Sequence, residues 1–265
     1  MSHYWRHGAV PFVEIRNVED GRAFSHAAHA HETFSIGAIV AGRSTYRNGA
    51  TQCEINAGDL VLINPRAVHA CNPVHGQPWA YRMFYVDSEW LGSLQSGHIS
   101  EFVPLAQTHV NDQCLFAGIE SLYRRLTDPR TPVAALETAA QDFFSRLLDS
   151  VDKQPAPPEH ERPEHRKLAT AARFIREHCS QPLSLDEIGH TAQLSASYLI
   201  RAFKARYGLT PHGYLVDCRI QLARARLRRG EAIAQVAAEL GFADQAHLQR
   251  VFKLRLAATP GQYRG

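Results

Sequence analysis

The residues that decide the fold of the C-terminal part are ASYLIRAFKARYGLTPHGY, residues 196–214, and QAHLQRVFKLRLAATPGQY, residues 245–263. The second stretch follows the first by 49 residues, and both contain Arg-x-Phe-Lys with Thr-Pro at the same distance after it. A phrase that recurs at a fixed offset indicates one supersecondary unit built more than once. The repeat therefore predicts two copies of one structural unit in this part of the chain.

Each copy has the pattern of two helices joined by a tight turn. Ser184 and Glu187 are placed to form a capping box at the start of the first copy, and Ser195 can cap its second helix. The inner face of the second helix is expected to hold Leu199 and Phe203 in one copy and Leu248 and Phe252 in the other. Two short helices around a tight turn, with polar residues early on the second, are typical of a helix-turn-helix motif.

Helical spacing continues through the whole C-terminal part. It predicts helices over 164–178, 184–192, 195–206, 211–229, 231–239 and 243–255. The long helix 211–229 connects the two copies. We expect its apolar face to pack on both copies through Leu215, Cys218, Leu222 and Ala225. We expect its arginines to remain in water, namely Arg224, Arg226, Arg228 and Arg229.

The charge of the chain is divided unevenly. Residues 164–265 carry 16 Lys and Arg against 8 Asp and Glu, a net charge of +8, whereas residues 1–163 carry 13 against 18, a net charge of −5. A basic module beside an acidic one indicates a polyanion-binding part. Gln and Arg on an exposed helix face can pair with base edges, and lysines can hold phosphates. The alternative is a structural helical repeat without a DNA partner.

Short strands dominate residues 11–104. TFSIGAIVAG (33–42) and DLVLIN (59–64) are β-rich runs, and Asn48-Gly49 is a strong hairpin signal. Many short strands at this spacing favour a small barrel or jelly roll.

Two amphipathic helices are expected to follow the strands within residues 111–151. The first begins near Asn111-Asp112, and Thr131 is the predicted N-cap of the second. Because one apolar face, which includes Leu136 and Leu147, is surplus to covering the barrel, we expect these helices to form a homodimer. The Pro-rich stretch 152–163 reads as a linker.

The composition is that of a globular protein of two domains, with 45% hydrophobic residues in 265. No apolar run is long enough to span a bilayer, and the N-terminus lacks the apolar region of a signal peptide. The five scattered cysteines contain no CxxC pair, which suits a reducing compartment. The expected location is the cytoplasm, with no membrane partner.

The C-terminal motifs resemble the AraC/XylS family of bacterial transcription regulators over residues 164–265. PLSLDEIG (182–189), the two repeated phrases and TPGQYR (259–264) stand in the family's order and spacing. Three positions depart from its pattern, with Gly189 where the family has Ala, and Gln193 and Ala257 where it has Gly. Gln193 must then adopt the turn conformation without glycine's freedom.

The resemblance also implies which residues read DNA. The base-reading positions correspond to Ser197, Ile200 and Arg201 in the first copy and to Gln245, Ala246, Gln249 and Arg250 in the second. Lys204 and Lys253 lie on the same faces and are expected to contact the DNA backbone. Because Ser197 and Ile200 are poor hydrogen-bonding readers, we expect the second copy to carry much of the polar readout.

The N-terminal half resembles the cupin-like sensor domain of the same family through HAHETFSIGAIVAG (29–42) and GDLVLINPRAVHACNP (58–73). Cupins bind a metal through His-x-His and a later His, whose counterparts are His29, His31 and His69, with Glu32 or His75 as further candidates. Three imidazoles suit zinc, nickel or iron, so a divalent metal is one expectation. The other is a metal-free pocket for a small-molecule effector. The effector pocket is expected to contain His29, His31, Tyr46, His69, Trp79 and Tyr81.

Together these features predict an α+β multidomain protein, with a cupin-like β-barrel and appended helices followed by an all-α domain with two helix-turn-helix motifs. The expected domains are 1–110, 111–151, the linker 152–163, and 164–265. The expected function is a ligand-responsive, sequence-specific DNA-binding transcription regulator that is not an enzyme. Its expected partners are double-stranded DNA, an effector, a second copy of the chain and, for an activator, RNA polymerase.

Two other functions stay open. One is a metal-dependent cupin enzyme fused to a DNA-binding domain. The other is a DNA-binding protein without a ligand, whose N-terminal half only dimerises.

Overall fold

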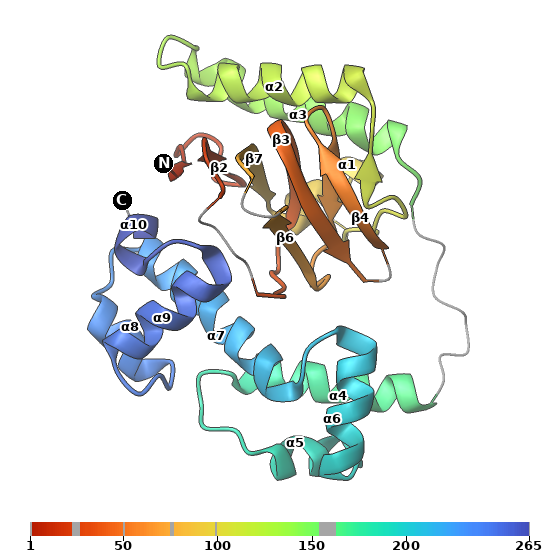
Figure 1. Ribbon diagram of the computed structural model, residues 1–265, viewed down its shortest axis with the longest axis vertical. Coiled ribbons are helices and arrows are strands. Elements are labelled where there is room, and N and C mark those ends of the chain that lie inside the picture. Colours follow the sequence, from red (N-terminus) through yellow and green to blue (C-terminus); the bar gives the residue numbers. More distant parts are fainter. Residues whose placement is uncertain are drawn as a thin grey trace. The chain divides into compact units, whose positions relative to one another are not determined.

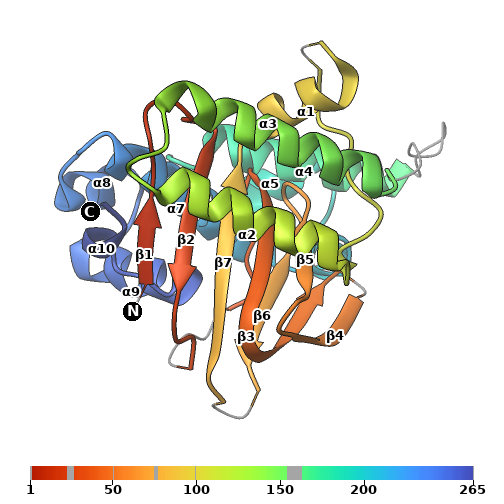
Figure 2. The same cartoon turned by 90° about the horizontal axis from the view of Figure 1, so that it is seen from above.

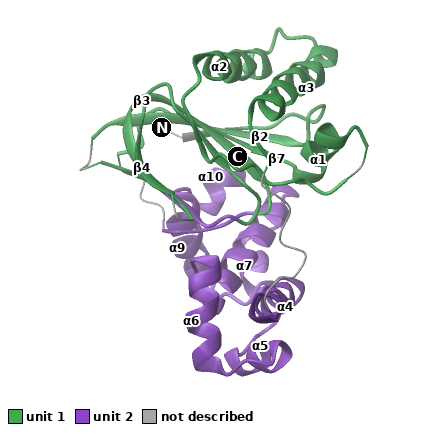
Figure 3. Ribbon diagram, turned by 90° about the vertical axis from the view of Figure 1, so that its right-hand side faces the viewer, with its two compact units in different colours: residues 1–24, 32–66, 71–155 green, residues 25–31, 67–70, 156–265 purple. Residues whose placement is uncertain are grey.

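Two compact units make up the protein, and Figure 3 shows them in two colours. The computed structural model describes residues 2–22, 27–49, 51–74, 77–98, 100–153 and 163–264. Unit 1 comprises residues 1–24, 32–66 and 71–155, and unit 2 comprises residues 25–31, 67–70 and 156–265. Most of the predicted linker, and His75, lie outside the described residues.

Unit 1 is built on an antiparallel sheet with the strand order β1-β2-β7-β3-β5-β8, while β4 and β6 pair with β3 off this path (Figure 2). The strands are β1 (Ser2–Trp5), β2 (Val13–Val18), β3 (Phe34–Asn48), β4 (Thr51–Asn56), β5 (Leu60–Ile63), β6 (His69–Pro73), β7 (Trp79–Val86) and β8 (His109–Val110). Asn48 pairs with Thr51, which confirms the predicted hairpin. The sheet confirms the predicted β-domain, and its closure into a cupin barrel stays a prediction.

One face of this sheet carries the core of unit 1. Ile15, Phe84, Ile36 and Leu62 face one another in register across β2, β7, β3 and β5. All four are buried in a single apolar cluster with residues of the helices that follow. Because side chains alternate between the two faces of a strand, each of these strands contributes every second residue to the core.

Three helices complete unit 1: α1 (Ser88–Ser96), α2 (Gln113–Thr127) and α3 (Val133–Ser150). Figure 2 shows α2 and α3 lying across the sheet. Asp112 caps α2 by accepting a hydrogen bond from the Leu115 N–H at 2.9 Å, as the sequence predicted. The predicted cap Thr131 is wrong. Pro132 is the N-cap of α3, and no side chain caps this end.

The apolar faces of α2 and α3 are both used inside unit 1. Leu136 and Leu147 are buried in the same cluster as the sheet residues. The expectation of a surplus apolar face is therefore wrong, because both helices bury their apolar residues in one cluster with the sheet. Among the described residues of α2 and α3, Val133 at the start of α3 is the most exposed large apolar residue. Its exposed fraction is 57%.

Unit 2 is helical apart from two short segments, 27–31 and 67–70, that come from the N-terminal half of the chain. Its helices are α4 (Pro163–His178), α5 (Leu185–Ala192), α6 (Ala196–Tyr207), α7 (Pro211–Arg228), α8 (Ile233–Glu239), α9 (Gln245–Leu256) and α10 (Pro260–Arg264). Figure 1 shows α7 running between α4–α6 at one end and α8–α10 at the other. The predicted helices are confirmed to within two residues at each end, and α10 is an addition to them.

The sides of α7 differ from the sequence prediction. Leu222, expected inside, is 39% exposed, whereas Arg224, expected in water, is 5% exposed. Leu215 is buried as predicted, and the buried residues of α7 also include Tyr214, Asp217, Ile220, Arg224 and Leu227. The Arg224 guanidinium donates a hydrogen bond to the Tyr263 hydroxyl at 3.2 Å, so α10 supplies the polar partner that this burial requires.

Candidate functional site

The second helix of the first repeated unit, α6, starts at a side-chain cap and buries one face. The Ser195 hydroxyl accepts a hydrogen bond from the Tyr198 N–H, and Leu199 and Phe203 are fully buried in the unit 2 core. The predicted DNA-contacting residues lie on the opposite, exposed face, and these are Ser197, Ile200, Arg201 and Lys204.

The second helix of the second repeated unit, α9, repeats this arrangement. Asp244 caps it by accepting a hydrogen bond from the His247 N–H at 2.6 Å, and Leu248 and Phe252 are fully buried. Gln245, Ala246, Arg250 and Lys253 are exposed, and Gln249 is half-buried. The two helices therefore present equivalent outer faces, in which Arg250 and Lys253 correspond to Arg201 and Lys204.

The turns of the two motifs adopt left-handed conformations. In the first, Gln193 ends α5 with a φ of 54°, as expected for a residue that takes the place of glycine. In the second, Gly241 has a φ of 71°. The Ser184 hydroxyl and the Glu187 carboxylate form the predicted capping box in front of α5. In contrast, Ala232 precedes α8 and has no side chain that could cap it.

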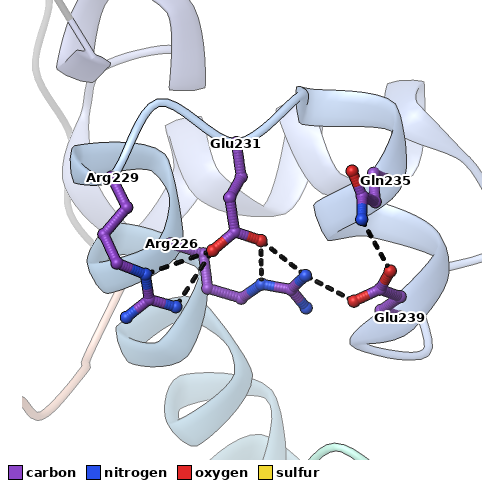
Figure 4. Close-up of polar contacts among 5 residues, drawn as sticks. All are labelled: Arg226, Arg229, Glu231, Gln235 and Glu239. Carbon is purple, nitrogen blue, oxygen red and sulfur yellow. Dashed lines mark hydrogen bonds and ion pairs between the residues drawn. The ribbon is translucent and has the colours of Figure 1, made fainter.

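A cluster of charged residues holds the start of the second motif (Figure 4). Arg226, near the end of α7, donates a hydrogen bond to the Glu231 carboxylate at 2.6 Å and another to Glu239 at the end of α8. Arg229 donates to the other oxygen of Glu231 at 2.9 Å, and Gln235 donates to Glu239 at 3.0 Å. This cluster joins α7 to both ends of α8.

The three predicted effector histidines lie together in unit 2. The ring centroids of His29 and His69 are 4.4 Å apart, and those of His31 and His69 are 4.8 Å apart. The main chains of His29 and His69 are hydrogen-bonded to each other in both directions, at 3.1 and 3.0 Å. The structure therefore brings together residues 40 positions apart in the sequence, as the prediction of a shared site requires.

The protonation of these rings is constrained by nearby carbonyls. Nδ1 of His29 lies 2.9 Å from the Ala27 carbonyl oxygen, and Nδ1 of His69 lies 3.0 Å from that of Ala67. A carbonyl only accepts, so Nδ1 carries the proton in each neutral ring and Nε2 is the basic nitrogen. Burial lowers the pKa of His69 to about 4, although the Ala67 carbonyl opposes the shift.

The metal hypothesis is not supported by this arrangement. Within the described ranges, no group of three or more His, Cys, Asp or Glu side chains is placed to hold a metal ion. The residues as they stand do not fit a bound metal.

The other predicted effector residues belong to unit 1. The Tyr46 hydroxyl donates to the Leu62 carbonyl at 3.1 Å and accepts from the Asn48 amide at 2.8 Å. The Trp79 and Tyr81 rings stack with centroids 4.4 Å apart. Burial raises the pKa of Tyr81 to about 12. These residues are buried, as pocket-lining residues would be, but Tyr46 uses its hydroxyl within the sheet.

Unit 1 also has an open groove of about 500 Å³ that the sequence did not suggest. It is lined by Pro65, Arg66, Ser88, Glu89, Ser100, Glu101 and Phe102. None of the predicted effector residues is among these lining residues, so the groove adds nothing to their assignment.

A buried ion pair in unit 2 was missed by the sequence interpretation. The Asp217 carboxylate on α7 lies 3.1 Å from Nε of Arg255 on α9 and accepts a hydrogen bond from the Ala30 N–H at 2.9 Å. Arg255 also donates to the Ala28 carbonyl, and Gln221 donates to the Ala30 carbonyl at 3.1 Å. Residues 28–30 are thus held by α7 and α9.

Burial and the neighbouring groups shift the pKa of Asp217 in opposite directions. Burial raises the pKa of Asp217 to about 7, while the Arg255 charge and the Ala30 N–H act in the opposite direction. A carboxylate on the buried stripe of a helix is the signal that could have revealed this residue, because such a group requires a partner.

Comparison with known proteins identifies both parts of the chain. The AraC-like ligand-binding domain matches residues 13–150, which is more than half of the chain, and a helix-turn-helix domain matches residues 188–265. The chain belongs to the AraC family of transcriptional regulators. Like other members, this AraC-family protein combines a ligand-binding domain with a helix-turn-helix DNA-binding domain.

Two curated relatives agree with this assignment to the AraC family. The HTH-type transcriptional regulator YbfI of Bacillus subtilis is 25% identical over 235 residues, which cover 83% of this chain and 80% of YbfI. The regulatory protein SoxS of Salmonella typhimurium is 34% identical over 98 residues, which cover 37% of this chain and 92% of SoxS.

A solved structure agrees with the fold of this AraC-family chain. ToxT of Vibrio cholerae, bound to an unsaturated fatty acid, has a TM-score of 0.59 at 14% identity, covering 95% of this chain and 94% of ToxT. No helix in the described part of the AraC-family chain is both long and apolar enough to cross a membrane.

Proposed function

We propose that α6 and α9 bind two neighbouring segments of the major groove of one duplex. The observation that carries this proposal is the equivalence of their outer faces, on which Arg201 and Lys204 match Arg250 and Lys253 while the equivalent apolar residues are buried. A major groove admits an α-helix whose exposed side chains reach the base edges. Two such helices on one framework recognise a longer DNA sequence than one helix alone.

The two helices have different roles in this proposal. Arg250 and Gln249 are expected to form paired hydrogen bonds with base edges, with Gln245 as a further reader. Arg201 is the main polar reader of α6, and its neighbour Ile200, 38% exposed, offers an apolar surface suited to a thymine methyl group. Ser197 and Ala246 make the close small-residue contacts, and Lys204 and Lys253 bind phosphates.

The test is a randomised-site selection with the full chain, started from duplexes of its own promoter region. We expect a specific site whose affinity falls steeply with salt, because lysines and arginines displace condensed counterions. Arg250→Ala should relax the preference at one base position, at a cost of about 1–3 kcal/mol. Arg228→Ala is the control, since this exposed arginine of α7 is on no predicted reading face. A selection that yields no preferred sequence would reject the proposal.

The effector is proposed to bind among His29, His31 and His69 of unit 2, and Tyr46, Trp79 and Tyr81 of unit 1 remain the other residues proposed for effector binding. The support is that the three histidine rings lie together and that Trp79 and Tyr81 stack on each other. A ligand that moves residues 28–30 would change their bonds to Asp217 and Arg255, so the response can reach α9. It can do so only by as much as its affinity differs between the two states.

The effector proposal can be tested without knowing the natural ligand. ToxT was solved with an unsaturated fatty acid, so unsaturated fatty acids are the first probes for calorimetry and for a reporter assay. Replacing His31 and His69 together by Ala should abolish the reporter response and leave operator binding intact. A normal dose-response in the double variant would place the pocket elsewhere.

We further propose that the protein is a cytoplasmic homodimer without enzymatic activity, and that it contacts RNA polymerase if it is an activator. Since Leu136 and Leu147 are core residues, the dimer contact must use exposed residues of α2 and α3. Val133→Glu is then the informative substitution, with light scattering as the measurement. Leu147→Glu should unfold the protein instead. A wild-type monomer at micromolar concentration would exclude the dimer.

A further inference from the structure

Arg219 lies in the middle of α7 and makes three hydrogen bonds to main-chain carbonyls. Its Nε donates to Cys179 at 2.9 Å, one terminal nitrogen donates to Gln181 at 3.0 Å, and the other donates to Gly241 at 3.0 Å. Each of the three guanidinium nitrogens therefore has a different acceptor. The sequence interpretation did not single out this residue.

The acceptors come from segments that border different helix-turn-helix motifs of unit 2. Cys179 and Gln181 follow α4 and lead into α5, the first helix of the first motif. Gly241 is in the turn between α8 and α9, the two helices of the second motif. One side chain thus joins the framework of the first motif directly to the turn of the second.

The turn of the second motif is shaped around this contact. Gly241 has a φ of 71°, a conformation that favours glycine. A Cβ atom at this position would lie 2.9 Å from a terminal nitrogen of Arg219, which is closer than real Cβ contacts come. Glycine is favoured here by its backbone conformation, and its lack of a Cβ also leaves the Arg219 guanidinium in its place.

The chemistry of arginine makes this a stiff connection. The guanidinium is planar and presents its donors in a fixed fork, so three simultaneous bonds fix its position and orientation. Hydrogen bonds from a charged donor are roughly twice as strong as neutral ones. Arg219 is half-buried, and burial lowers its pKa, but an arginine remains charged at any physiological pH.

We propose that Arg219 is a positioning residue that sets the distance and angle between α6 and α9, and so determines which spacing between the two DNA segments the protein accepts. The inference rests on the proposed function, because it assumes that both helices bind one duplex. Successive major-groove faces recur about every 10.5 base pairs along one side of the helix, so a rigid pair of reading helices fits one spacing. Loosening the pair should broaden the accepted spacing.

The experiment uses the full chain and the duplex from the site selection. Derivatives of this duplex have one or two base pairs inserted or removed between the two contacted segments. For the wild type we expect about a tenfold loss of affinity per base pair of mis-spacing. For Arg219→Gln we expect the optimum to weaken about tenfold and the penalty for mis-spacing to fall below about threefold. The base preference within each segment should not change.

Two further variants separate positioning from charge and from folding. Arg228→Gln removes the same charge from the same helix at an exposed position, and it should keep the sharp spacing optimum. Arg219→Lys keeps the charge but lacks the fork, so it should also broaden the optimum; if Arg219→Gln fails to fold, as judged by thermal unfolding, this variant decides the question.

Three outcomes would overturn the inference. In the first, a folded Arg219→Gln or Arg219→Lys variant retains the wild-type spacing profile. In the second, its affinity falls equally at all spacings, as Arg228→Gln would cause through charge alone. In the third, the wild type selects no duplex at all, so that the proposed function itself fails. The first two leave specific DNA binding intact, so they are distinguishable from the third.

Discussion

The two helix-turn-helix motifs share a buried frame and differ at their ends. Leu199 and Phe203 in the first motif, and Leu248 and Phe252 in the second, are all fully buried at an offset of 49 residues. The helix starts are different, because a capping box precedes α5 whereas Ala232 precedes α8 without a side-chain cap. The duplicated part of this fold is therefore the apolar frame, while each copy has its own means of holding its first helix.

In the second motif, α8 has no side-chain cap and is held instead by contacts from α7. Arg226 binds Glu231 just before α8 and Glu239 at its end, so two carboxylates hold the helix to its neighbour (Figure 4). In the first motif the corresponding function is served within four residues by Ser184 and Glu187. Equivalent helices can thus be fixed locally or from a distance.

The equivalence of the frames predicts the largest effects. Phe203→Ala and Phe252→Ala should each destabilise unit 2 by about 3–5 kcal/mol, because each leaves a cavity in place of a fully buried ring. Leu254→Ala, at a site 55% exposed, is the control and should cost far less. Denaturant unfolding measures all three. If only one of the two Phe→Ala variants lost stability, the buried frames of the two motifs would not be equivalent.

The proposed DNA-reading faces of α6 and α9 predict the next largest effect. Ile200 and Gln249 are equivalent positions with different chemistry, so Gln249→Ile should remove a base contact worth about 1–3 kcal/mol and relax the preference at one position. The reciprocal change Ile200→Gln should not relax any position read by α9. Site selection with both variants is the measurement. Equal effects of the two substitutions would contradict a division of labour between α6 and α9.

The different starts of α5 and α8 predict smaller changes in the stability of unit 2. The substitution in the first motif should lower it and that in the second should raise it. Ser184→Ala should destabilise unit 2 by about 1 kcal/mol, because the Glu187 N–H loses its partner. Ala232→Ser should stabilise unit 2 by about the same amount, since it supplies the missing cap. Ala234→Ser, inside α8, is the matched control and should not stabilise. Thermal unfolding of the three variants tests the contrast.

The turns predict the smallest effect. Gln193 has a φ of 54°, so Gln193→Gly should relieve left-handed strain and raise the stability of unit 2 by about 0.5 kcal/mol after the greater flexibility of the unfolded chain is subtracted. Ala257, with a φ of 47° at the end of α9, should respond in the same way to Ala257→Gly. Gln193→Ala keeps the Cβ atom that strains this left-handed backbone. Its thermal unfolding should therefore show no gain in stability.

Periodic and capped elements were predictable from the sequence. The repeated phrase placed α6 and α9, and Asp112 and Ser184 marked helix starts, because these signals depend on residues within a few positions of one another. The exposed face of both reading helices followed from the same spacing. By contrast, Thr131 was misassigned as a cap because the backbone of Pro132 extends the non-helical segment by one residue.

Contacts between segments that are distant in the sequence could not be predicted from local patterns. Asp217 meets the Ala30 N–H across 187 positions, and Arg219 meets Gly241 across a folded motif, so neither partner is visible in the local pattern. The buried position of Arg224 depends on Tyr263 in the same way. The three histidines were chosen by resemblance, and their membership of unit 2 follows only from tertiary contacts.

The placement of residues 28–30 against α7 and α9 has a consequence for biosynthesis. Ala30 leaves the ribosome 187 residues before Asp217, which at ordinary bacterial and eukaryotic rates of translation is roughly 10 to 40 s. During that interval the nascent segment lacks its partners on α7 and α9, although His69 is already available to pair with His29. The bond between them closes a very long loop, whose entropic cost grows only slowly with length. These contacts are therefore among the last that a newly made chain can form, and a transcript that ends before α7 yields a protein in which they never form.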